Sequence, residues 1–126
     1  MATIKSYTDI EQSKVLAEIL PLDSADYFYK YCIGHYNSIY YRLETYPYNK
    51  GGNKNHDIPC WSLSALLGVL PKLGAEEPII QKIYYASNPT ERYICQYSLT
   101  NMTGEYDNPV DACYEMVTIL KEKNLI

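Results

Sequence analysis

Hydrophobic and polar residues alternate along the chain with two different periods, and the changes between these periods mark its elements. Residues 10–20 have helical spacing, and we predict a helix that Pro21 ends. The segment before it has the form of a capping box, with Thr8 as the N-cap and Glu11 at N3. The apolar stripe of this helix comprises Ile10, Val15, Leu16, Ile19 and Leu20.

A period of two, typical of strands, follows the first helix. Residues 27–33 (YFYKYCI) and 38–43 (SIYYRL) form two such runs, separated by a turn at residues 34–37. The same pattern returns in residues 79–85 and 92–99, with a turn at residues 87–90 between them. A second turn at residues 101–104 leads to residues 105–106, a short edge strand. We therefore predict two antiparallel hairpins.

Two further helices are expected, one after each hairpin. The first begins after Ser62, a good N-cap, and ends at Pro71. The last has Asn108 as N-cap, Pro109 at N1 and Asp111 at N3, beside the positive end of the helix dipole. We predict that its buried face comprises Val110, Ala112, Cys113, Met116, Val117 and Leu120.

These elements follow one another in the order α-ββ-α-ββ(β)-α. We predict a single α+β domain over residues 1–126, in which an antiparallel sheet of four to five strands has helices packed mainly on one face. A length of 126 residues suits one domain. Residues 45–57, with one proline, two glycines and three asparagines, are predicted to be a flexible loop within it.

The charge and hydropathy of the chain argue against several classes of partner. Its net charge is −4, and the lysines and arginines are scattered, so nucleic-acid binding is not expected. No apolar stretch is long enough to span a membrane, and the N-terminus lacks the order of a signal peptide. We expect a cytoplasmic protein that needs no cofactor.

Three segments carry a family resemblance: EQSKVLAEILPLDSAD (11–26), IPCWSLSALLGVLP (58–71) and YDNPVDACYEMVTILKEKNLI (106–126). In this order they resemble a family of small uncharacterised proteins that phages, prophages and mobile elements of gut Bacteroidales encode. The resemblance covers about half of the chain. It implies a viral or mobile-element origin and a place in the cytoplasm of the host bacterium or in the virion. It implies no reaction.

The cysteines and histidines offer one candidate for chemistry. The C-x2-H pair Cys32–His35 and the H-x3-C pair His56–Cys60 together supply the ligands of a tetrahedral zinc site, provided that the loop folds back on the hairpin. The same pairs are the candidates for a Cys–His nucleophile. The other interpretation is that the four cysteines, which have no C-x2-C spacing, are free thiols and the histidines lie in solvent. We expect no enzyme.

Tyrosine is the most conspicuous residue of the chain, with 15 copies against one Phe and one Trp. Adjacent tyrosines on a strand must point to both faces of the sheet, so some of them are expected on the face without helices. Such clusters make good contact surfaces. The residues that we expect to bind a partner are Tyr36, Tyr40, Tyr41, Arg42, Tyr84, Tyr85 and Arg92.

The functional hypothesis is a non-catalytic protein-interaction module of a phage or mobile element. It would contact a host or viral protein through its tyrosine-rich sheet face and the loop at residues 45–57. A homodimer through the same residues is an alternative partner arrangement. A second hypothesis is a small-molecule binder that sequesters a nucleotide signal of host defence by ring stacking. The third is a zinc-binding protein or a Cys/His-dependent enzyme.

Overall fold

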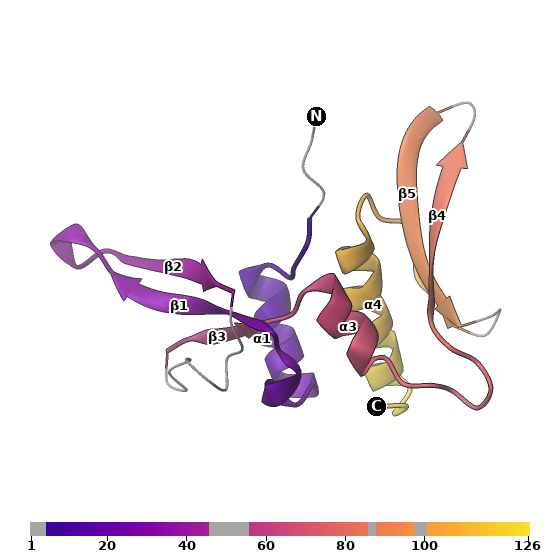
Figure 1. Cartoon of the computed structure of the whole chain (residues 1–126), viewed down its shortest axis with the longest axis horizontal. Coiled ribbons are helices and arrows are strands. Elements are labelled where there is room, and N and C mark those ends of the chain that lie inside the picture. Colours follow the sequence, from indigo (N-terminus) through magenta and orange to yellow (C-terminus); the bar gives the residue numbers. More distant parts are fainter. Residues whose placement is uncertain (1–4, 46–55, 86–87, 98–100) are drawn as a thin grey trace. The chain divides into compact units, whose positions relative to one another are not determined.

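The computed structural model describes residues 5–45, 56–85, 88–97 and 101–126. The chain divides into two compact units, each with its own three-stranded antiparallel sheet. The N-terminal unit is Tyr7–Ala65, and the C-terminal unit is Leu66–Ile126 together with the first residues up to Ser6. Figure 1 shows the elements of both units.

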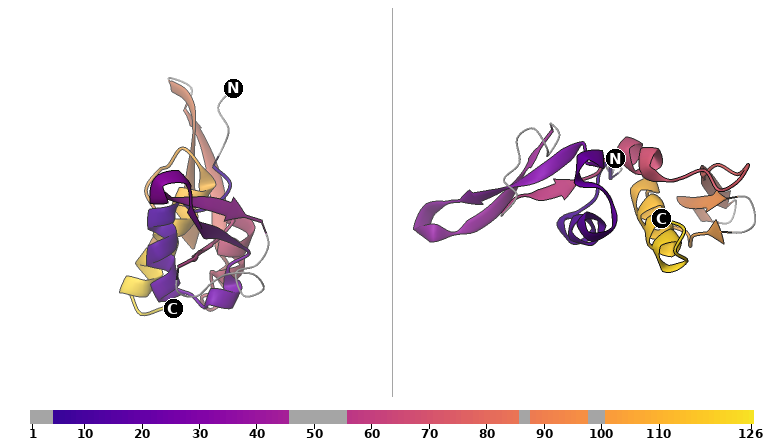
Figure 2. Two further views of the ribbon diagram at one scale, coloured as in Figure 1. Left: turned by 90° about the vertical axis from the view of Figure 1, so that its left-hand side faces the viewer. Right: turned by 90° about the horizontal axis from the view of Figure 1, so that it is seen from below.

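The N-terminal unit consists of a helix, a hairpin and a short third strand. Its sheet has the order β2-β1-β3, and Figure 2 shows β1 and β2 running on beyond β3 as a two-stranded ribbon. The only strong helix contact described for this sheet is made by α1 against β3. The elements are α1 (Ile10–Ile19), the 3-10 turn η1 (Leu22–Ser24), β1 (Tyr27–Ile33), the 3-10 turn η2 (His35–Asn37), β2 (Ile39–Glu44) and β3 (Ile58–Cys60).

The N-cap of α1 is Asp9, so the prediction of a Thr8 cap was wrong by one residue. Asp9 accepts a hydrogen bond from the Gln12 N–H at 2.8 Å, and the Gln12 side chain accepts one from the Asp9 N–H at 3.1 Å. Thr8 is instead buried, and its N–H donates to the Trp61 carbonyl at 2.9 Å. The predicted capping box therefore exists, but Asp9 and Gln12 form it, and Thr8 is a buried residue.

The short link between α1 and β1 is fixed to the segment that follows β3. Trp61 is fully buried, and its indole N–H donates to the Ser24 hydroxyl at 2.9 Å. Asp26 accepts hydrogen bonds from both the backbone N–H and the hydroxyl of Ser62. The Ser62 hydroxyl in turn accepts the Ala65 N–H at 3.2 Å, as expected of the predicted N-cap.

The C-terminal unit has the sheet order β4-β5-β6, with α4 packed mainly on β5 (Figure 1). Tyr106 adds an isolated bridge to Tyr93 of β5. Its hydroxyl donates to the Glu115 carboxylate of α4, and this bond together with partial burial raises the Tyr106 pKa to about 12. The elements are α3 (Leu63–Val69), which begins in the other unit, β4 (Ile79–Tyr85), β5 (Asn88–Tyr97), β6 (Asn101–Met102) and α4 (Pro109–Glu122).

The predicted cap and buried face of α4 are confirmed. The Asn108 side chain accepts the Asp111 N–H at 2.8 Å, and Pro109 is the first helical residue. All six residues predicted to be buried are buried. Cys95 of β5 and Cys113 of α4 are fully buried free thiols, and their mutual contact and burial raise the pKa of Cys113. Both cysteines therefore behave as small core residues.

The α+β class with antiparallel strands is confirmed, and the boundaries of the strands 27–33 and 79–85 agree with the prediction. The strands are distributed over two sheets of three, whereas one sheet of four to five was expected. The described residues form six strands, because Ile58–Cys60 joins β1 as a third strand and Asn101–Met102, predicted as a turn, joins β5. Among the described residues, no helix is long and apolar enough to cross a membrane.

Candidate functional site

One face of the β1–β2 hairpin is built entirely from apolar and tyrosine side chains. Residues that lie directly opposite each other in an antiparallel pair share a face, and alternate residues along each strand return to it. The register therefore places three cross-strand pairs on this face, which we call the ladder face: Tyr29–Leu43, Tyr31–Tyr41 and Ile33–Ile39.

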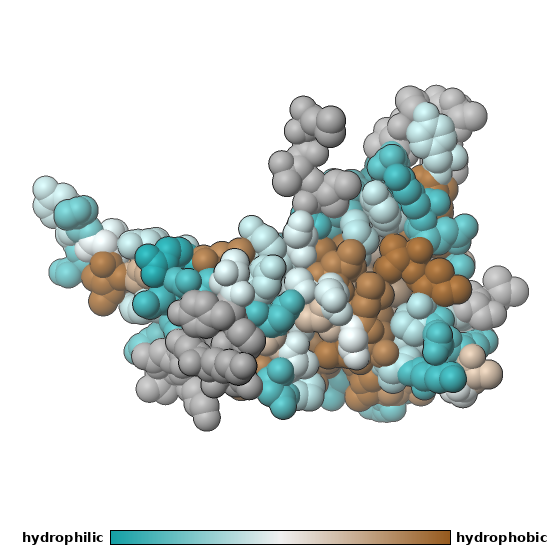
Figure 3. Space-filling view, viewed as in Figure 1, coloured by the Kyte–Doolittle hydropathy of each residue, from teal (hydrophilic) through white to brown (hydrophobic). Residues whose placement is uncertain are grey.

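The ladder face becomes more exposed toward the turn. Tyr31 and Tyr41 are half-buried and pack edge to face, with their ring centroids 5.9 Å apart. Ile33 and Ile39, one pair further on, are 65% and 60% exposed. Figure 3 shows apolar atoms near the far end of the arm that Figure 1 labels β1 and β2. Contiguous exposed apolar patches mark contact surfaces, and this isoleucine pair continues the apolar and tyrosine side chains of the ladder face.

The base of the hairpin, in contrast, is firmly anchored. Phe28 is fully buried, and the Tyr29 hydroxyl donates to the Thr8 carbonyl at 2.6 Å. Burial, followed by the neighbouring Cys60 thiol, raises the pKa of Tyr29 far above its ordinary value. The Tyr31 N–H, which points away from β2, donates to the Asp57 carboxylate at 2.8 Å. The ladder face therefore extends from a base that burial and hydrogen bonds hold in place.

The turn of the hairpin holds a tyrosine in a left-handed conformation. Tyr36 and Asn37 have φ values of 58° and 59°, and the Ser38 N–H donates to the His35 carbonyl at 3.1 Å. Two consecutive positive φ values are the pattern of a type I′ turn, which favours Asn-Gly. Tyr36 is fully exposed. Its side chain therefore gains no packing in return for the strained backbone.

Beyond the buried Phe28 at its base, the opposite face of the hairpin is mainly polar, and we call it the polar face. It carries an unfavourable pair of charges. Lys30 lies directly across from Arg42, and like charges at opposed positions destabilise a sheet. Glu44 relieves this repulsion, because its carboxylate lies 2.8 Å from an Arg42 guanidinium nitrogen. The same contact raises the pKa of Arg42. Arg42 is thus already paired within its own strand.

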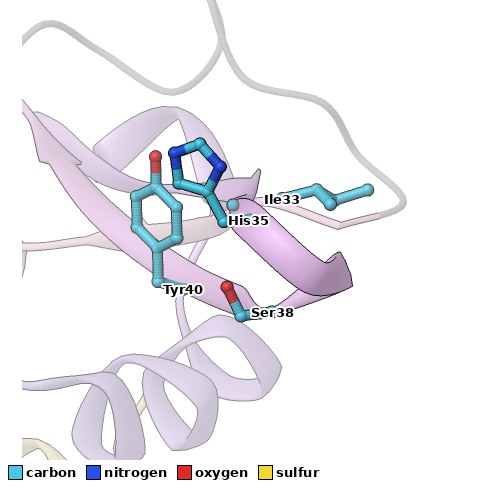
Figure 4. Close-up of a pocket in the computed structure, with 5 residues that line it drawn as sticks. Ile33, His35, Ser38 and Tyr40 are labelled. Atoms are coloured by element: carbon cyan, nitrogen blue, oxygen red, sulfur yellow. The ribbon is translucent and has the colours of Figure 1, made fainter.

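An open hollow lies at the tip of the hairpin, where its lining includes Ile33 of the ladder face. Figure 4 shows the rings of His35 and Tyr40 standing close together, with Ser38 below them. A Cβ atom on Gly34 would lie 2.9 Å from the Ser38 hydroxyl and 3.2 Å from the Tyr40 ring, so a larger residue would displace one of these side chains. No lysine or arginine among the described residues lines this hollow. It therefore offers little to a phosphate.

The seven residues predicted to bind a partner fall into two groups. Tyr36, Tyr40, Tyr41 and Arg42 belong to the hairpin of the N-terminal unit. Tyr84, which is 65% exposed, and the half-buried Arg92 lie in the C-terminal unit, where the backbone of Tyr85 ends β4. The side chain of Tyr85 and residues 46–55 of the predicted loop lie outside the described residues.

The four candidate zinc ligands occupy different environments. Cys60 is fully buried, donates to the Thr8 carbonyl at 3.4 Å and has a pKa raised by burial. His35 is an exposed turn residue, and His56 stacks on Tyr31 with ring centroids 4.9 Å apart. Cys32 lies on the polar face of β1 opposite Tyr40. Within the described part of the chain, no three His, Cys, Asp or Glu residues form a group that could hold a metal.

Sequence reasoning did not include Ile33 and Ile39 among the binding residues, although they are the most exposed pair of the ladder face. The signal was present, because YFYKYCI and SIYYRL both alternate with period two. The missing information was the register, which depends on the conformation of the turn.

Comparison of the chain with known protein families, with curated proteins and with solved structures gives no match.

Proposed function

We propose that the chain is a non-catalytic protein-binding module whose contact surface is the ladder face and turn of the β1–β2 hairpin. The observation that carries this proposal is the exposed Ile33–Ile39 pair at the end of a continuous apolar and tyrosine ladder. Apolar side chains that are exposed to water gain favourable free energy when a partner buries them. The resemblance to mobile-element proteins makes a host or viral protein the proposed partner, in the host cytoplasm.

The conformation of Tyr36 supports the same proposal. A residue held in the left-handed region destabilises the fold by about 1–2 kcal/mol relative to an ordinary conformation. Such strain tends to collect at functional sites. A fully exposed Tyr36 contributes no packing that would offset it. A large, stiff aromatic ring at the tip of a hairpin is well suited to anchor a protein contact.

The test is affinity capture from a gut Bacteroidales lysate with the wild type, a double variant of the proposed surface and a single control variant outside it. Ile33→Ser with Ile39→Ser removes the exposed pair of the ladder face. Ile79→Ser makes the same chemical change at an isoleucine of β4 that is 54% exposed and outside the proposed surface. We expect the wild type and Ile79→Ser to capture the same protein. The double variant should capture less of it by a factor of about ten or more, because residues at the centre of an interface contribute most of the binding energy.

Unchanged capture by the double variant, with circular dichroism showing an intact fold, would contradict the proposal. Equal losses in all variants would mean that exposed apolar residues bind the lysate protein without specificity. Tyr84→Ser, tested alongside, separates a contribution of the C-terminal unit from that of the hairpin.

A further inference from the structure

The outer edge of β2 is an open backbone edge. β2 is the last strand in the order β2-β1-β3. Gly34 donates its N–H to the Ser38 carbonyl at 2.7 Å, which marks this pair as hydrogen-bonded. Hydrogen-bonded pairs alternate with non-hydrogen-bonded ones, so the backbone groups of residues 40, 42 and 44 point to β1. The N–H and C=O groups of Ile39, Tyr41 and Leu43 therefore point outward.

No described residue satisfies this edge in the way that Asp57 satisfies the outward N–H of Tyr31 on β1. Exposed edges are usually protected, often by a lysine. The edge strand of the other sheet, β4, has Lys82 at its centre, paired with Glu91 of β5 at 2.9 Å. On β2 the charged residue is Arg42, which pairs with Glu44 of the same strand at 2.8 Å, and Ile39 and Tyr40 are 60% and 49% exposed. Its edge is therefore open to another strand.

We propose that this edge pairs with the β2 edge of a second copy of the chain, antiparallel about a two-fold axis at Tyr41. The two three-stranded sheets would join into one continuous sheet, and both ladder faces would lie on the same side of it. This contact is independent of the proposed function, because the ladder face remains open to a partner.

The pattern of the edge selects this register. A new ladder must join outward-pointing groups on both strands. Only a register centred on Tyr41 uses Ile39, Tyr41 and Leu43 of both copies, with Ile39 opposite Leu43 of the second copy and Tyr41 opposite itself. A shift of one residue in the direction of the turn leaves Leu43 opposite Asn37, a turn residue with a φ of 59°. A shift of one residue in the direction of the strand end pairs Ile39 with Thr45 and leaves Leu43 opposite Tyr41.

Electrostatics favours the same register. In the Tyr41-centred pairing, Arg42 lies opposite Tyr40 of the second copy at a close, non-hydrogen-bonded position, where a guanidinium is attracted to an aromatic ring. In the register shifted toward the strand end, Arg42 would lie opposite Arg42 of the second copy, and the two charges would repel each other. The edge is therefore complementary to itself. Because β2 has only 6 residues, we expect a concentration-dependent dimer rather than an obligate one.

Disulfide cross-linking tests directly which residues of the two β2 strands lie opposite each other. Opposed hydrogen-bonded residues have Cα atoms about 5.5 Å apart, a distance that a disulfide spans. In a Cys32→Ser background, with the other three cysteines buried, we expect Tyr41→Cys to form covalent dimers with diamide as oxidant. Leu43→Cys alone should not, since its two copies would lie about 14 Å apart along the strands. A mixture of Ile39→Cys and Leu43→Cys chains should cross-link, and this pair tests the register without removing Tyr41.

Sedimentation of the unmodified chain and of Arg42→Glu completes the test. The new carboxylate would gain Lys30 as its partner within the hairpin and lose the ion pair with Glu44, while it would also lose both contacts with Tyr40 across the dimer. We expect a dimer dissociation constant about tenfold higher with little change in thermal stability, because one exposed ion pair replaces another. A chain that stays monomeric at all concentrations would overturn the proposal. Cross-linking of Leu43→Cys alone would also overturn it, because that result requires another register. The binding of a strand of a different protein to this edge would overturn it as well.

Discussion

At the scale of single residues, Tyr36 is the clearest case in which conformation and chemistry disagree. A β-hairpin turn with two left-handed residues favours glycine or asparagine, and Asn37 fits this preference. Tyr36 does not fit it, and its side chain is fully exposed. Strained residues cluster at functional sites, so the conformation of Tyr36 agrees with the proposed contact surface.

Tyr36→Gly should therefore stabilise the protein. Relief of the left-handed strain gives about 1–2 kcal/mol, and the greater flexibility of glycine in the unfolded chain offsets about half of this. We expect a net gain of about 0.5–1 kcal/mol in the free energy of unfolding, measured by urea denaturation. Asn37→Gly, at nearly the same φ, is the control and should gain less, because asparagine tolerates this region. A loss of stability in Tyr36→Gly would show that the ring contributes to the fold.

At the scale of elements, the sequence predicts best where the determinants are local. The cap and buried face of α4 were predictable because Asn108, Pro109 and the apolar stripe all lie within one segment. The start of α1 was not, because both Thr8 and Asp9 begin a capping-box pattern. The choice between them depends on Trp61, whose carbonyl takes the Thr8 N–H from a distant part of the chain.

The third strand of the N-terminal sheet was missed for a similar reason. Ile58–Cys60 is too short to show a period, and a proline at its centre argues against a strand. In the structure Pro59 lies opposite Phe28. Because Phe28 directs its own hydrogen bonds to β2, this is a position where a strand needs no N–H from the proline. The candidate site has the same limit, since its pairs could be assigned only once the register was known.

The N-cap of α4 makes a second prediction. Asn108→Ala removes the acceptor of the Asp111 N–H and the donor to Asp107 and Asp111, all within a nearly buried site. We expect a loss of about 1–2 kcal/mol in the free energy of unfolding, at the upper end of the range for N-caps. Asn108→Ser keeps an acceptor at the cap and should recover part of this loss. Equal losses in the two variants would mean that the amide donor matters more than the cap.

At the scale of the whole molecule, the prediction of a single domain means that the two units should unfold cooperatively. The boundary between the two units falls within α3, between Ala65 and Leu66, so no linker separates them in the sequence. Each unit alone has about 60 residues, a size at which independent stability is marginal. We therefore expect the two units to unfold together, in one transition.

The single tryptophan makes this expectation testable. Trp61 lies in the N-terminal unit, so its fluorescence reports on that unit, whereas far-ultraviolet circular dichroism reports on both. In urea the two signals should give the same midpoint. Asn108→Ala sharpens the test, because its cap lies in the C-terminal unit. If the units are coupled, the midpoint of Trp61 fluorescence must fall together with that of circular dichroism. If Trp61 fluorescence keeps its wild-type midpoint while circular dichroism shifts, the units unfold separately and the chain consists of two domains.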